Sequence, residues 1–170
     1  MAGMFVRYYL ELPLAAAQVE QTLVDAAPGW LASLSTAAQE RGEGLASRVG
    51  VGPGAEPGVA PEARSVRQVV LALGPPVHLP TMTWLPLRWE PLGLDGLLPR
   101  LDATIELGPL GRDRTQLAIS AQFEPPPGPS QGFDRGMAQR VAEATLKDFL
   151  DQLGHAIVLS HLGPAANIPP

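Results

Sequence analysis

The histidines are the first candidates for chemistry, because imidazole is a common metal ligand and the commonest general base near neutral pH. His155 and His161 lie six residues apart in one predicted helix, whereas two ligands on one helix face need a spacing of three or four. His78 is far away in the sequence. We therefore predict no metal site, and interpret each histidine as a surface or partly buried side chain.

Motifs for nucleophilic catalysis and phosphate binding are also missing. The chain contains no cysteine, which excludes disulfides, thiol catalysis and zinc–thiolate sites, and it has neither a G-x-S-x-G nor an H-E-x-x-H motif. Gly50 to Gly58 is rich in glycine, but a phosphate-binding loop must open a helix, and Pro53, Pro57 and Pro61 rule out a helical period there. The sequence predicts no catalytic residue and no cofactor.

A few aromatic and charged side chains are candidate handles for a ligand. Trp84 and Trp89 lie five residues apart in an extended segment, so they face opposite sides, and one of them could stack on an aromatic ligand. Arg88 could orient a ligand in an apolar pocket, although together with Glu90 it also fits a surface pair. Tyr8 could offer a phenol. Packing in the core or at its rim is the alternative for the tryptophans.

Two segments that could form the walls of such a pocket alternate between apolar and polar residues. The apolar positions are Leu101, Ala103, Ile105 and Leu107 in the first, and Leu117, Ile119, Ala121 and Phe123 in the second. Gly108 to Asp113 lies between them and supplies turn residues. The pattern predicts an antiparallel hairpin with one buried and one solvated face.

A long helix is predicted from Asp134 to about Ser160. Its apolar stripe consists of Ala138, Ala142, Leu146, Phe149, Leu153 and Ile157. At about 1.5 Å per residue, such a helix is on the order of 40 Å long, enough to cross a whole sheet. On the opposite side, Glu143 is expected to pair with Lys147 at i,i+4.

The remaining chain supplies more strands and two short helices. We predict strands at Phe5–Leu12, Leu45–Val51 and Val66–Leu73, interrupted strands near a sheet edge within Val77–Glu90, helices at Ala15–Ala26 and Trp30–Arg41, and a loop at Gly52–Ala63. Strands and helices are segregated along the chain, which favours the α+β class over a parallel fold. Residues 1–162 are predicted to form one domain, followed by a flexible tail at 163–170.

Composition and net charge limit the kinds of molecule that the chain is expected to bind. The chain has 170 residues, of which 45% are hydrophobic, and a formal net charge of -5 without any basic run. A nucleic-acid surface depends on clustered Lys and Arg, so we predict no nucleic-acid partner. The uncharged stretch from Gln68 to Leu87 contains several prolines, which a membrane-spanning helix would not accept. We predict a soluble, cytoplasmic protein without a membrane span.

In the order of its elements and in several short sequence segments, the chain resembles members of the START-like, or helix-grip, superfamily (SRPBCC). The segments that carry the resemblance are LPLRWEP at Leu85–Pro91, LDATIEL at Leu101–Leu107, RTQLAISAQFEPPPG at Arg114–Gly128 and VAEATLKDFLDQL at Val141–Leu153. This superfamily includes lipid-transfer domains, bacterial polyketide aromatase/cyclases and the major birch-pollen allergen. The chain is similar to uncharacterised bacterial members.

The resemblance implies a curved antiparallel sheet that grips the long C-terminal helix and leaves a ligand cavity between them. Carried onto this chain, the cavity would be lined by Leu101, Ala103, Ile105, Leu107, Leu117, Ile119, Ala121, Phe123, Leu146, Phe149 and Leu153. Its mouth would lie near Pro125–Gly132. No catalytic residue is common to the superfamily, so none is transferred.

Three functions remain open at this point. The first is a binding or carrier domain for a small hydrophobic molecule, either lipid-like or polycyclic aromatic. The second is a polyketide-type cyclase or aromatase, which would need an acid or base inside the cavity, whereas Asp102, Glu106 and Glu124 are predicted to face outward. The third is a cavity-free protein-interaction module, in which Ala103 and Ala121 allow close packing. The sequence leaves the oligomeric state open.

Overall fold

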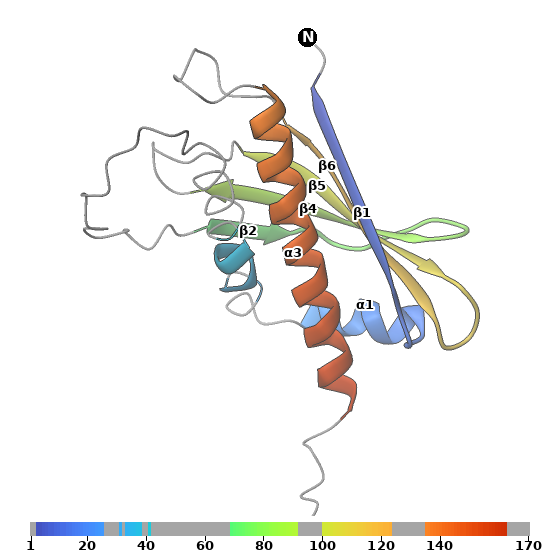
Figure 1. Ribbon diagram of the computed structural model, residues 1–170. Helices are drawn as coiled ribbons and strands as arrows, with labels where there is room; N and C mark the ends of the chain where they lie inside the picture. The colour runs from blue at the N-terminus through green and yellow to red at the C-terminus, as the bar shows by residue number, and fades with distance from the viewer. Residues whose placement is uncertain are drawn as a thin grey trace, which may run out of the picture.

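The chain forms one antiparallel sheet with a long helix across its inner face (Figure 1). The computed structural model describes residues 3–25, 31, 33–38, 41, 69–91, 100–123 and 135–162. The strands are β1 (Met4–Leu12), β2 (Val69–Leu73), β3 (Val77–His78), β4 (Thr83–Pro91), β5 (Leu101–Pro109) and β6 (Thr115–Phe123); the helices are α1 (Ala16–Asp25) and α3 (Arg135–His161). Residues 31, 33–38 and 41 are also helical and are called the short helical segment.

The sheet has six strands in the order β1-β6-β5-β4-β2, and β3 pairs with β4 beside that path. The predicted hairpin is confirmed as β5 and β6, whose registered pairs include Ile105 with Ile119 and Ala103 with Ala121. Gly111 lies in the connecting turn with a φ of 126°, a conformation that favours glycine because it has no Cβ. The α+β class with an antiparallel sheet and a C-terminal helix is therefore confirmed.

The proline-containing strands lie near a sheet edge as predicted, since β4 is next to the edge strand β2. The predicted interruption is wrong for β4, which runs unbroken from Thr83 to Pro91. The reason lies in the direction that Pro86 faces. Its carbonyl oxygen accepts a hydrogen bond of 2.7 Å from the amide of Gly74, just beyond the end of β2. The proline nitrogen faces the same side, so its missing N–H costs the sheet no hydrogen bond to β5.

The long helix α3 is confirmed as one unbroken element, and Phe149 and Leu153 are fully buried as predicted. The predicted ion pair between Glu143 and Lys147 is wrong. Lys147 donates to Asp151 at 2.7 Å, while Glu143 accepts a hydrogen bond of 2.8 Å from Gln139. Glu143 and Asp151 both lie four residues from Lys147, so helical periodicity alone did not show which carboxylate would pair with it.

Helix α3 approaches β1 closely at Gly154. A Cβ atom at this position would lie 3.1 and 3.3 Å from the Leu10 methyl carbons and 3.3 Å from a methyl carbon of Leu12. These distances are shorter than ordinary van der Waals contact, so only a residue without a side chain fits without moving its neighbours.

We expect Gly154→Val to lower the free energy of unfolding by about 1–3 kcal/mol, because the isopropyl group overfills the contact with β1. Urea denaturation measures the change. His155→Val is the matched control, since His155 is exposed on the same helix. Helix propensity would favour valine over glycine, so an equal change in both variants would contradict the close approach.

Several sequence predictions fall outside the described residues: the strand at Leu45–Val51, the loop at Gly52–Ala63, Glu124, the mouth at Pro125–Gly132 and the tail at 163–170. Within the described residues, none of the helices combines the length and the apolar character needed to cross a membrane.

Candidate functional site

The residues predicted to line a cavity all lie on the inner face of the sheet or on the facing side of α3, and none is more than 7% exposed. They belong to one apolar core together with Trp89. The Trp89 ring meets Phe149 edge-on, with ring centroids 5.2 Å apart and planes at 80°, so this pair fills the space between β4 and α3. The structure thus brings the predicted residues together as packed core, and their contact with a ligand stays a prediction.

The candidate handles are split between the two faces of the sheet. Trp89 is fully buried on the inner face, whereas Trp84 is 42% exposed and Arg88 is exposed on the outer face. The two tryptophans therefore do face opposite sides. Tyr8 is partly buried against the core, and the Nζ atom of Lys147 lies 5.1 Å from the centre of its ring. Only Trp89 and Tyr8 lie on the side of α3.

Two histidines connect other elements to α1. The Nε2 atom of His78 lies 2.7 Å from the Glu20 carboxylate, and Nε2 of His161 lies 2.7 Å from the Thr22 hydroxyl. His155 is exposed. Across the described ranges, no three His, Asp or Glu side chains are grouped as metal ligands would be.

An apolar pocket of about 490 Å³, here called the edge pocket, opens on the inner side of the sheet at its β2 edge. Its lining consists of Leu23, Val24, Leu31, Leu71, Ala72, Leu73, Gly74, Pro75 and Pro76. None of these described side chains has a polar atom, so the polar atoms that they bring to the pocket wall belong to the backbone. Such a wall suits an apolar molecule that needs one or two hydrogen bonds for orientation.

The pairing of β2 with β4 shows which core residues lie next to the edge pocket. Leu71 pairs with Trp89 and Leu73 with Leu87, and directly paired residues of an antiparallel sheet point to the same face. Leu23 and Leu31 belong to the same buried cluster as Trp89. The edge pocket therefore lies beside the part of the core that pairs with β2.

A second pocket of about 750 Å³, the helix-end pocket, lies on the other flank of α1. It is lined by Gln21, Thr22, Asp25, Ser33, Leu34, Ala156, Ser160 and His161. Helix α1 and the short helical segment contribute to both pockets, whereas α3 contributes only to this one. Neither pocket includes a residue that the sequence predicted as cavity lining.

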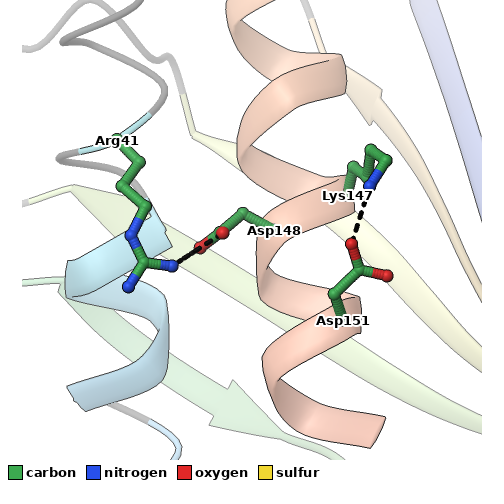
Figure 2. A network of polar contacts seen from close by, with 4 residues as sticks. All are labelled: Arg41, Lys147, Asp148 and Asp151. Atoms are coloured by element: carbon green, nitrogen blue, oxygen red, sulfur yellow. Dashed lines mark hydrogen bonds and ion pairs between the residues drawn. The ribbon is translucent and has the colours of Figure 1, made fainter. Parts of the chain in front are cut away.

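An ion pair holds the short helical segment against α3. One guanidinium nitrogen of Arg41, Nη1, lies 2.7 and 2.6 Å from the two carboxylate oxygens of Asp148 (Figure 2). On the neighbouring flank of α3, the hydrogen bond and charge of Asp151 raise the pKa of Lys147 above its usual value.

Thr145 is the one buried side chain among the described residues whose hydroxyl has no hydrogen-bond partner. It lies on α3 with no exposed area. A buried polar group left unpaired costs about 1–3 kcal/mol. The equally buried Thr115 differs, because its hydroxyl donates to the Leu14 carbonyl at 2.7 Å.

Thr145→Val is expected to raise the free energy of unfolding by about 1 kcal/mol, since it removes an unpaired hydroxyl at little change in volume. Thr115→Val should instead lower it by about 1 kcal/mol or more, because the Leu14 carbonyl loses its donor. Urea denaturation of both variants gives the comparison. Losses of similar size in the two variants would show that the Thr145 hydroxyl is paired.

Comparison of the sequence with protein-family models and with curated proteins gives no match. Similar solved structures exist. An uncharacterised protein from Bacillus thuringiensis is 12% identical with a TM-score of 0.50, covering 91% of this chain and 99% of that one. A START superfamily protein from Mycobacterium smegmatis is 15% identical with a TM-score of 0.49, covering 94% and 99%. The aromatase/cyclase from Streptomyces sp. R1128 is 16% identical with a TM-score of 0.41, covering 92% and 96%.

The fold that the sequence resemblance implied is confirmed. Likeness at such low identity shows the fold alone, and that fold is the helix grip: an antiparallel sheet packed against a long C-terminal helix.

Proposed function

We propose that this protein binds a small hydrophobic molecule, with the edge pocket as its binding space. The observation that carries the proposal is the wall of the edge pocket: its described side chains are all apolar, and two of them, Leu71 and Leu73, pair directly with the core residues Trp89 and Leu87. Its volume is within the range of about 300–1,000 Å³ found for small-molecule sites. Helix-grip neighbours such as the Streptomyces aromatase/cyclase give this expectation further support.

The inner face favours binding without chemistry. No ionisable side chain of the described residues is fully buried on this face, because Tyr8 is partly buried and His78 is exposed and contacts Glu20. The buried polar residues of the described chain are Ser35, Thr115 and Thr145. Asp102 and Glu106 lie on the outer face, where Glu106 pairs with Arg7 at 2.7 Å. A cyclase would need an acid or base beside the ligand, so the cyclase alternative lacks support from the described residues.

A ligand screen tests the proposal. Thermal-shift measurements with fatty acids, sterols and aromatic polyketides should give a rise in the melting temperature that depends on ligand concentration, because a ligand that binds only the folded state stabilises it. No response to any of these compounds would contradict the proposal and favour the protein-interaction module. Conversion of a bound polyketide would favour the cyclase.

A further inference from the structure

The helix-end pocket lies between the C-terminal ends of two helices. Gln21, Thr22 and Asp25 belong to the last two turns of α1, and Ser160 and His161 to the last turn of α3. The last carbonyl groups of a helix have no intrahelical donors and carry partial negative charge. Helix α1 has no basic residue in its last turn to offset this charge. The position of the pocket therefore favours a cation.

The two hydroxyl groups of Thr22 and Ser160 already donate to backbone carbonyls. The Thr22 hydroxyl donates to the Gln18 carbonyl at 2.9 Å, and the Ser160 hydroxyl donates to the Ile157 carbonyl at 2.6 Å. Because a hydroxyl has one proton, the 2.7 Å contact between Thr22 and His161 requires Nε2 of His161 to be the donor. A neutral His161 then has Nδ1 left as an acceptor. A ligand can therefore donate hydrogen bonds to Thr22, Ser160 and a neutral His161, which still have free lone pairs.

Asp25 adds a full negative charge to these acceptors. Its Oδ2 atom accepts a hydrogen bond of 2.7 Å from the Gln21 side chain, and Oδ1 makes no hydrogen bond to the rest of the described chain. Among the described residues, the pocket lining includes no Lys or Arg. A ligand that donates hydrogen bonds and carries positive charge therefore complements this rim.

The rest of the pocket is apolar. Leu34 and Ala156 supply hydrocarbon surface, and a volume of about 750 Å³ is far larger than a bare ion requires. A divalent cation would also need several oxygen ligands around one point, whereas Asp25 is the only carboxylate in the lining. We propose that the helix-end pocket binds a small organic ammonium ion whose apolar body rests on Leu34 and Ala156 and whose head lies between Asp25 and Thr22.

Calorimetric titration of the full chain tests this proposal with three compounds of matched shape. We expect 2-phenylethylamine, which is protonated at pH 7, to bind at least tenfold more tightly than 2-phenylethanol, and 3-phenylpropanoate to bind least. Equal affinities for the three, or no binding of the amine, would overturn the proposal.

Variants locate the site. Asp25→Asn should weaken binding of 2-phenylethylamine at least tenfold and leave that of 2-phenylethanol unchanged. The control Asp102→Asn, which neutralises an exposed carboxylate on the outer face, should change the binding of neither compound.

Ala156→Trp should abolish binding of 2-phenylethylamine by filling the helix-end pocket. Leu71→Trp, which alters only the edge pocket, should leave amine binding intact. If Asp25→Asn has no more effect than Asp102→Asn, the helix-end pocket is not the amine site.

Discussion

Phe149→Ala is expected to lower the free energy of unfolding by about 3–5 kcal/mol, measured by urea denaturation. The Phe149 ring is fully buried and meets Trp89 edge-on at 5.2 Å, so its removal loses buried apolar surface and also leaves a void between β4 and α3. The ring pair joins α3 to β4.

Phe5→Ala is the matched control, because Phe5 is 53% exposed on the outer face of β1. The same chemical change there should cost less than about 1 kcal/mol, as substitutions on an exposed surface usually do. If Phe149→Ala also costs less than about 1 kcal/mol, the ring is not part of a packed core.

The second large effect concerns ligand binding. Leu71→Trp should weaken the binding of any apolar ligand found in the screen at least tenfold, which corresponds to about 1.4 kcal/mol. The indole would occupy part of the edge pocket, whose volume is about 490 Å³. Isothermal titration or a thermal-shift series measures the loss.

Val70→Trp provides the control on the same strand. Val70 precedes Leu71 and points to the opposite face, where it is 45% exposed. This variant introduces the same side chain outside the pocket and should bind the ligand as the unaltered protein does. Equal affinity in the two variants would exclude the edge pocket as the binding space.

The fold followed from local patterns in the sequence. Alternation at Leu101–Leu107 and Leu117–Phe123 fixes which side of each strand is buried, and the stripe ending at Ile157 does the same for α3. These patterns depend on neighbouring residues along the chain, so they are readable without knowing the tertiary arrangement.

The pockets did not follow from the sequence, because residues distant in the chain assemble them. The helix-end pocket combines residues of α1, the short helical segment and the end of α3, from Gln21 to His161. The sequence predicted these three helices but contained no signal for how they meet. The unbroken course of β4 was missed for a similar reason, since only the tertiary structure shows that Pro86 faces the end of β2.

The central claim is that an apolar ligand occupies the edge pocket, and methyl NMR of leucine- and valine-labelled protein tests it most directly. On addition of a ligand from the screen, we expect intermolecular nuclear Overhauser effects to the methyl groups of Leu23, Leu71 and Leu73, and none to the exposed Val70 and Val77. Contacts confined to Val70 and Val77, or a bound ligand without contact to Leu71 and Leu73, would contradict the claim.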